Sequence, residues 1–205
     1  MEKRIAVVGA PGSWSTEKLA DTIAERTGFR LVVDMERVWF DAEAMTVRAG
    51  DRDLLELDGL VIKKLGRQYS PNMLDRCEYL LFLEQRGLPV FSSPGALFAC
   101  INRTSCTLRL QAAGIPMPPT VCTEDPGAAL EAVRRFGEAI YKPLYSTKAR
   151  GMKLLAAGDP ELEGKVAGLA RGGGTLYIQK RIDLPGQDLG VVFLGGEYLD
   201  TYARV

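Results

Sequence analysis

Short apolar segments alternate with helix start signals along the first 95 residues, and this alternation constrains the fold more than any other feature. Ile5–Gly9 is an apolar run that leads through a glycine-rich turn into a helical pattern. Leu31–Val33 and Asp58–Gly66 are two further strand candidates, each flanked by turn residues. Because strands that alternate with helices form parallel sheets, the sequence predicts an α/β domain.

The next segments complete this first domain. Ser70 is the expected cap of a helix that opens at Pro71, and Pro89–Phe91 is a strand candidate behind it. The apolar stripe over Ala96–Ala113 predicts one further helix, followed by a proline-rich joint. We therefore expect an N-terminal domain over residues 1–95 and a second domain over residues 96–205.

The second half of the chain mixes helices and strands in a different order. Asp125 and Asp159 each precede a proline, a pattern typical of helix starts. A hairpin is expected around Gly195 and Gly196. The predicted strands are Ala139–Pro143, Met152–Ala157, Thr175–Lys180, Asp188–Leu194 and Tyr198–Tyr202.

Composition excludes several classes of protein. Lysine and arginine total 26, as do aspartate and glutamate, so no global positive field attracts nucleic acid or a membrane, and any anion site is local. The chain has no histidine, which excludes Ser-His-Asp and Cys-His catalysis and histidine-containing zinc sites. Its four cysteines form no Cys-x-x-Cys pair. Since we find neither a signal-peptide core nor a long apolar run, we expect a cytoplasmic protein.

Two segments near the N-terminus are candidate anion sites. The turn Gly9–Thr16 precedes a helix, but its spacing fits neither nucleotide-binding glycine pattern, which favours a structural turn. Lys63, Lys64 and Arg67 follow a predicted strand, at the sheet edge where ligand groups commonly lie. They form either a site for a carboxylate or an acidic peptide, or a solvated charged loop.

The segment around Lys142 is the most informative. Its ammonium group is predicted to lie among apolar neighbours at the end of a strand, which is unfavourable unless an anion meets it. The loop Pro143–Gly151 follows and contains hydroxyl groups and cations. Such a loop either folds over phosphate groups through charge-assisted hydrogen bonds or forms an exposed hairpin.

Six motifs together have a recognisable order. They are Phe91-Ser-Ser-Pro94, Asn102-Arg103, Gly114-Ile-Pro-Met-Pro-Pro-Thr120, Tyr141-Lys-Pro143, Arg150-Gly151 and Tyr177-Ile-Gln-Lys-Arg-Ile182. This order resembles the ATP-grasp ligases, and most closely the RimK-like glutamate and peptide ligases. The resemblance covers most of the chain. It implies a parallel-sheet, pre-ATP-grasp-like domain followed by an incomplete ATP-grasp domain of the α+β type.

The resemblance also implies roles for single residues. Lys142 and Arg103 match cations that contact the nucleotide phosphates, and the main chain of 179–182 matches the hinge that binds adenine. Lys64 matches a basic residue on the substrate side, and Arg204 an arginine that helps to hold the reacting phosphoryl or carboxyl group. The nucleotide-binding residues implied in this way are Arg103, Lys142, Ser146, Thr147, Lys148, Arg150, Gly151, Gln179, Lys180, Arg181, Ile182 and Asp188.

The chain departs from the family in its phosphate loop, in its metal ligands and at Gly190, where relatives usually carry an arginine. Its loop Ser146–Gly151 keeps one glycine and carries two cations, so side-chain contacts are expected to replace the usual backbone contacts to phosphate. The acidic and asparagine ligands that bind Mg²⁺ in the family are expected beyond Val205. No metal ligand is therefore assigned, and the resemblance implies a truncated chain.

The resemblance implies an ATP-dependent carboxylate–amine ligase that forms an acylphosphate from an amino acid or a peptide. Phosphoryl transfer depends on positioning and on cations, so it does not require histidine. ATP, Mg²⁺ and an amino-acid or peptide substrate are the expected partners, with a homo-oligomer as one option. One alternative is a non-catalytic nucleotide- or peptide-binding module that receives an acidic partner at Lys63, Lys64 and Arg67. The other is an unrelated dinucleotide protein that uses the turn at Gly9, which the spacing argues against.

Overall fold

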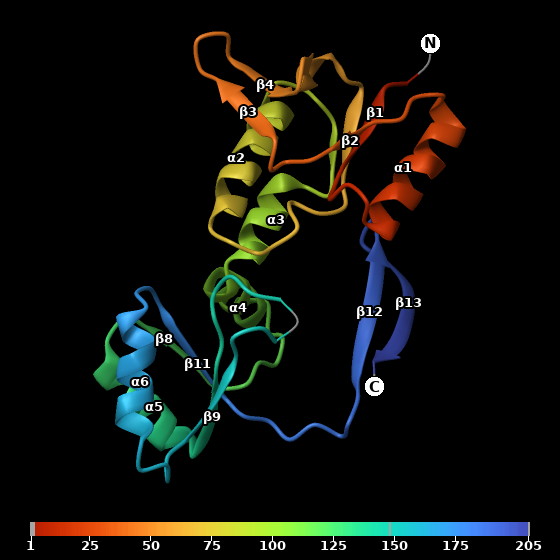
Figure 1. The fold of residues 1–205 in the computed structure, drawn as a ribbon. Helices are drawn as coiled ribbons and strands as arrows, with labels where there is room; N and C mark the ends of the chain where they lie inside the picture. Colours follow the sequence, from red (N-terminus) through yellow and green to blue (C-terminus); the bar gives the residue numbers. More distant parts are fainter. Residues whose placement is uncertain (1–2, 148, 205) are drawn as a thin grey trace. The chain divides into compact units, whose positions relative to one another are not determined.

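The structure, a computed structural model, describes residues 3–147 and 149–204, which form two compact units (Figure 1). The first unit runs to Pro116 and includes the loop Pro143–Gly151. The second unit consists of Met117–Lys142 and the chain from Met152 onward. The loop thus packs with the first unit although both its neighbours in sequence belong to the second. The division at residues 95 and 96 follows the family resemblance and stays a prediction.

The first unit contains the predicted parallel sheet. Its strands are β1 (Ile5–Val8), β2 (Val32–Val33), β6 (Gly59–Ile62) and β7 (Val90–Phe91), in the order β2-β1-β6-β7. Helix α1 (Trp14–Thr27) leads from β1 to β2, and helix α2 (Asn72–Gln85) leads from β6 to β7 in the opposite direction. Because crossovers of parallel strands are right-handed, the two helices lie on opposite faces of the sheet (Figure 1). The strand order reverses between β1 and β6, so the loops after these two strands are neighbours.

A small antiparallel sheet in the first unit was not predicted. It consists of β3 (Val38–Asp41), β4 (Thr46–Ala49) and β5 (Arg52–Asp53), followed by a short 3-10 helix at Leu54–Glu56. These strands span two to four residues, and β4 and β5 contain no apolar run; only Val38–Phe40 of β3 carries the signal by which a strand is detected in a sequence.

Two predictions about helices in this unit were wrong in detail. The single helix expected over Ala96–Ala113 is two helices, α3 (Pro94–Ile101) and α4 (Arg103–Ala112). Asn102 separates them in an extended conformation, and its side-chain oxygen accepts the N–H groups of Thr104 at 2.9 Å and Ser105 at 3.2 Å. Ser70 is not the cap of α2, because Pro71 occupies that position and the helix begins at Asn72.

We expect Asn102→Ala to lower the free energy of unfolding by about 1 kcal/mol, because two N–H groups of α4 lose their acceptor. Urea titration measures this change. Asn72→Ala, at an exposed position in the first turn of α2, is the matched control and should change stability by less. Equal effects of the two substitutions would contradict the role of Asn102 as a cap.

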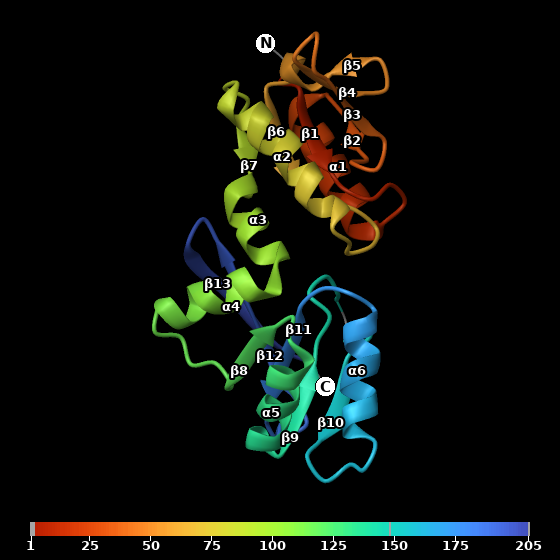
Figure 2. The ribbon, with the colours of Figure 1, turned by 90° about the vertical axis from the view of Figure 1, so that its left-hand side faces the viewer.

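The second unit contains a four-stranded antiparallel sheet in the order β10-β9-β11-β8. Its strands are β8 (Thr120–Thr123), β9 (Glu138–Tyr141), β10 (Lys153–Ala156) and β11 (Leu176–Lys180). Helices α5 (Pro126–Phe136) and α6 (Leu162–Arg171) lie side by side on one face of the sheet (Figures 1 and 2). The start of α5 at Asp125 is confirmed, since its carboxylate accepts two backbone N–H groups. Strand β8 was missed because three prolines lie just before it.

Alternation along the strands divides this sheet into two different faces. Ala139, Leu155 and Ile178 point toward the helices and are buried in their core. Residues at the alternate positions, among them Ile140 and Gln179, therefore lie on the opposite face. This second face is where the candidate site lies.

The last two strands form a separate two-stranded ribbon. Strands β12 (Asp188–Leu194) and β13 (Glu197–Arg204) pair in antiparallel register, which confirms the predicted hairpin. Gly195 and Gly196 adopt φ values of 62° and 91° at its turn, a conformation that favours glycine. In the described ranges, no helix combines the length and the apolarity that crossing a membrane requires.

The core of the first unit contains the thiol of Cys77, which is 0% exposed. Burial raises the pKa of this thiol to about 11. The folded state therefore holds the proton more tightly than the unfolded state, and the resulting stabilisation is full below about pH 9 and is lost as the pH rises through about 11.

Iodoacetamide at pH 8 should therefore modify the exposed Cys100 and Cys122 of the folded protein quickly, and Cys77 only after unfolding. Mass spectrometry of the labelled peptides, with and without urea, measures the three rates. Rapid labelling of Cys77 without urea would contradict its burial in the core.

Candidate functional site

A cavity lined partly by apolar and partly by charged residues lies on the helix-free face of the second sheet. Ile140 of β9 is directly opposite Leu154 of β10 on one side and Gln179 of β11 on the other, so the three side chains form its floor. The cavity has a volume of about 730 Å³. Leu154, Ile182 and Leu184 line it and are 53%, 48% and 72% exposed, so they leave apolar surface uncovered in a hollow of the size of small-molecule sites.

Lys142 lies at the end of β9 on the wall of this cavity. Its ammonium group donates a hydrogen bond of 2.6 Å to the Oε1 atom of Gln179. The Nε2 atom of Gln179, whose side chain is 5% exposed, donates to Thr120 Oγ1 at 2.9 Å and to the Tyr177 hydroxyl at 3.3 Å. Gln179 is thereby fixed by two strands and orients the ammonium group.

The segment after β11 forms another wall of the cavity. The N–H groups of Lys180 and Arg181 donate to the carbonyl oxygens of Pro119 at 2.8 Å and Glu138 at 3.0 Å. The Arg181 guanidinium also pairs with the Glu138 carboxylate at 3.0 Å. Two of the predicted hinge N–H groups are thus committed to the sheet, whereas the described part of the chain gives the N–H of Ile182 no acceptor.

A second cavity, of about 720 Å³, lies in the first unit and has basic walls. The predicted cluster of Lys63, Lys64 and Arg67 lines it, and Arg150 joins them from the loop Pro143–Gly151. The Lys64 ammonium donates to Ser13 Oγ at 2.8 Å, and Arg67 Nη2 donates to the Pro11 carbonyl oxygen at 3.3 Å. The cluster is therefore part of a cavity wall.

The turn after β1 uses its own N–H groups internally. The N–H of Gly9 donates to Val33, that of Ser13 donates to Ala10, and that of Gly12 donates to the Glu17 carboxylate at 2.7 Å. This last bond, followed by the pairing with Arg30, holds the pKa of Glu17 below its ordinary value. The dinucleotide alternative thus gains no support from the turn, which is structural.

Arg103 and the loop Pro143–Gly151 contact each other. The Nε atom of Arg103 donates to the Pro143 carbonyl at 3.1 Å, and Nη2 donates to the Ser146 carbonyl at 3.4 Å and hydroxyl at 3.3 Å. Arg103 therefore holds the loop that contributes Thr147 and Arg150 to the basic cavity. Gly151 has a φ of 71°, which favours glycine. Lys148 lies outside the described residues.

The remaining predicted residues lie apart from both cavities. Asp188 begins β12 and is opposite Arg204 in the backbone register of the hairpin, and Asp188 is exposed. Nothing is described of the Arg204 side chain. Throughout residues 3–147 and 149–204, acidic and cysteine side chains do not gather in groups of three that suit a metal ion.

Comparison with known proteins shows what this chain is similar to. No family model matches the chain. The tetrahydromethanopterin:alpha-L-glutamate ligase of Methanosarcina acetivorans is 26% identical over 220 residues, which span 100% of this chain and 68% of that protein. The RimK domain ATP-grasp protein of Sphaerobacter thermophilus superimposes with a TM-score of 0.77 at 19% identity, over 98% of this chain and 73% of that one. The chain thus resembles ATP-grasp ligases in sequence and in fold.

A further ATP-grasp structure is similar to this chain. The ligase PsnB, complexed with a phosphomimetic variant of its minimal precursor, Mg and ADP, superimposes with a TM-score of 0.61 at 20% identity over 93% of this chain and 68% of PsnB. The resemblance inferred from the motif order is confirmed, and so is the α/β fold with its parallel N-terminal sheet. The roles of the individual site residues stay predictions.

Sequence reasoning missed three side chains of the candidate site. The side chain of Gln179, predicted to act through its main chain, holds Lys142. Ile140 and Leu154 form the cavity floor. The sequence signal for all three is the alternation of side chains along correctly predicted strands: each lies next to a residue that points toward the helices, so each must point to the opposite face.

Proposed function

We propose that this chain provides the nucleotide-binding site of an ATP-dependent ligase that joins a carboxylate to an amine. The observation that carries this proposal is the Lys142 ammonium, fixed by Gln179 at the edge of an apolar cavity. An apolar hollow suits a purine ring, and a cation at its edge suits the phosphate groups attached to that purine. The similarity to a glutamate ligase and to PsnB supports the same conclusion.

The residues have separate tasks in this proposal. Ile140, Leu154 and Ile182 contact the faces of the base, and the Ile182 N–H donates to its edge. Lys142 meets the phosphate groups. Because Gln179 carries no charge, its hydrogen bond orients the ammonium group without neutralising it.

The proposed reaction has two steps. A carboxylate oxygen of the substrate bonds to the γ-phosphorus of ATP while the bond from this phosphorus to the β–γ bridging oxygen breaks, and ADP leaves. An amine then attacks the carbonyl carbon of the acylphosphate, loses a proton and displaces phosphate. Cations that hold the phosphoryl group in position supply most of the catalysis in reactions of this type. An amino acid or a peptide is the proposed substrate.

Magnesium accompanies ADP in the PsnB complex. Among the described residues of this chain, no three acidic or cysteine side chains gather in a group that could hold a metal ion, so no residue is assigned to Mg²⁺.

Calorimetric titration with ATP, GTP and adenosine tests the nucleotide site. We expect ATP to bind more tightly than adenosine, because only ATP has phosphate groups that contact Lys142. We also expect ATP to bind more tightly than GTP, because the Ile182 N–H can donate to N1 of adenine, whereas N1 of guanine carries a hydrogen. Absence of binding by ATP would contradict the proposed site.

Hydroxylamine distinguishes a ligase from a non-catalytic module. An acylphosphate reacts with hydroxylamine to give a hydroxamate, so ATP-dependent hydroxamate formation from an amino acid or a peptide is expected from the ligase. Binding of ATP without hydroxamate from any carboxylate tested would favour the non-catalytic alternative.

A further inference from the structure

Two cysteines lie next to each other where helices α3 and α4 meet. Cys100 is in the last turn of α3 and is exposed, whereas Cys106 is in the first turn of α4 and is half-buried. The thiol of Cys106 shares a hydrogen bond with the thiol of Cys100. Both thiols are free in this structure, so the pair is in its reduced form.

The break between the two helices brings these cysteines together. In one continuous helix, residues six apart are separated by about 9 Å along the axis and by about 120° around it, so their side chains do not meet. Asn102 is extended instead, with φ −81° and ψ 114°, and α4 runs in a different direction from α3 (Figure 2). Because Asn102 also caps α4, its side chain maintains the turn that places the two thiols side by side.

The two thiols differ in how they can react. Cys100 lines the basic cavity of the first unit, so a small molecule in solution reaches its sulfur. Burial, followed by the proximity of Cys100, raises the pKa of Cys106, which therefore stays protonated at neutral pH. Since the thiolate is the attacking form of a cysteine, we expect Cys100 to react first and Cys106 second.

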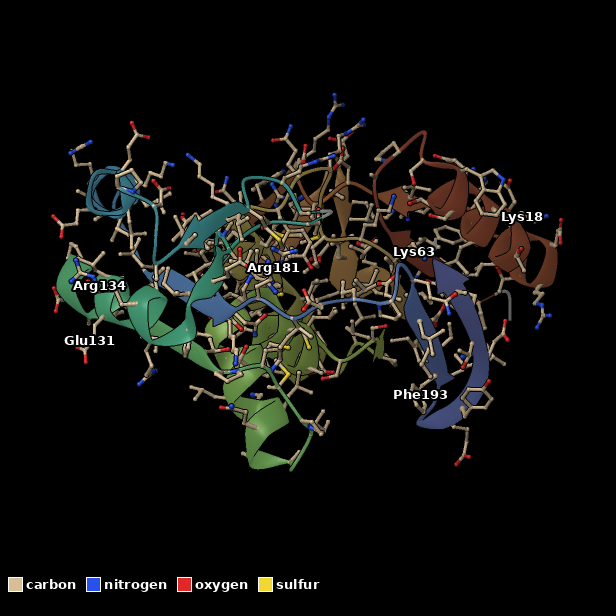
Figure 3. All side chains as sticks on the ribbon, turned by 90° about the horizontal axis from the view of Figure 1, so that it is seen from below. Lys18, Lys63, Glu131, Arg134, Arg181 and Phe193 are labelled. Carbon is tan, nitrogen blue, oxygen red and sulfur yellow. The ribbon has the colours of Figure 1, made fainter. Side chains whose placement is uncertain are left out.

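The charge around Cys100 favours an anionic reagent. Lys63 (labelled in Figure 3), Lys64, Arg67 and Arg150 line the same cavity, and none of the described side chains that line it is a carboxylate. A disulfide that carries carboxylates, such as oxidised glutathione, is attracted by these cations. Added salt screens this attraction, so salt should slow the reaction of Cys100 with oxidised glutathione and not its reaction with a neutral disulfide.

We propose that Cys100 and Cys106 are a redox modification site, which an anionic low-molecular-weight disulfide of the class of oxidised glutathione converts to an intramolecular disulfide. The Cys100 thiolate attacks one sulfur of the reagent, the S–S bond of the reagent breaks, and the first thiol leaves with the proton that Cys100 lost. Cys106 then attacks the Cys100 sulfur and displaces the second thiol, which takes the proton of Cys106. Two protein thiols are thereby oxidised, and one reagent disulfide is reduced to two thiols.

The test uses trypsin, which cuts after Arg103 and so separates the two cysteines. The folded protein is incubated with oxidised glutathione at pH 8, and the remaining thiols are blocked with iodoacetamide. Mass spectrometry of the tryptic peptides is done without a reductant. We expect a disulfide that joins peptide 87–103 to peptide 104–109.

Two variants and one change of conditions identify the pair. In Cys106→Ser, Cys100 should keep one glutathione, because the second step has no thiol. The control Cys122→Ser removes an exposed cysteine of the other unit and should give the joined peptides as the wild type does. In urea the turn at Asn102 is lost, so the ratio of joined peptides to the glutathione adduct of Cys100 should fall about tenfold or more.

Four results would overturn this inference. They are a stable glutathione adduct at Cys100 in the folded wild type, an equal ratio of the two products in folded and urea-treated protein, loss of the joined peptides in Cys122→Ser, and the same salt dependence with oxidised glutathione and with neutral bis(2-hydroxyethyl) disulfide. No step of this reaction uses ATP, so each of these results leaves the proposed nucleotide site unaffected.

Discussion

Replacing Lys142 by methionine should weaken the binding of ATP by about 10- to 100-fold, as expected for losing one charge-assisted hydrogen bond of about 1.5–3 kcal/mol. Methionine keeps the apolar stem that lines the cavity and removes only the charged group. Calorimetry gives the two dissociation constants. Lys165→Met is the matched control, because Lys165 lies on α6 and its ammonium group pairs with the carboxylate of Asp159. This control should bind ATP as the wild type does.

Adenosine shows whether the loss occurs at the phosphate groups. It has no phosphate, so its affinity should be the same for the wild type and Lys142→Met. If the substitution weakens adenosine and ATP equally, Lys142 shapes the cavity and does not contact phosphate. If neither affinity changes, the nucleotide lies elsewhere and the proposed site is wrong.

Replacing Gln179 by leucine should lower the free energy of unfolding by about 1–3 kcal/mol, because leucine has a similar size and no polar atoms. Its partners Thr120, Tyr177 and Lys142 would each lose a hydrogen bond. Urea titration measures the change. Gln111→Leu, at an exposed position of α4, is the control and should have little effect.

Gln179→Glu separates the structural role of this residue from its effect on charge. A carboxylate at this position still accepts from the Lys142 ammonium, but it cannot replace the bond that Gln179 Nε2 donates to Thr120, whose hydroxyl already donates to the Pro118 carbonyl oxygen at 2.8 Å. We therefore expect more stability than in Gln179→Leu, but weaker ATP binding, because the new negative charge neutralises Lys142 and repels phosphate. Unchanged ATP affinity in Gln179→Glu would show that the neutrality of Gln179 is unimportant.

Elements of the fold were predictable where residues close in the sequence determine them. The strand at Ile5, the start of α5 at Asp125 and the hairpin at Gly195 depend on apolar runs, caps and turn residues, which neighbouring residues determine. The prediction of one helix across Asn102 was wrong, because the side chain of Asn102 accepts backbone N–H groups of α4 and thereby starts a second helix. The short strand β8 follows three prolines, which hid it in the sequence, and it forms by pairing with β11, far along the chain.

The candidate site was predictable only in part. The sequence by itself determined that a lysine follows β9, that a basic cluster follows β6 and that these 205 residues contain no histidine. Only the tertiary structure decided that Gln179 holds Lys142 and that Arg150 joins Lys63, Lys64 and Arg67 around one cavity. The physical reason is that residue type and local spacing determine which groups a strand presents, whereas strand order and register determine which distant groups meet.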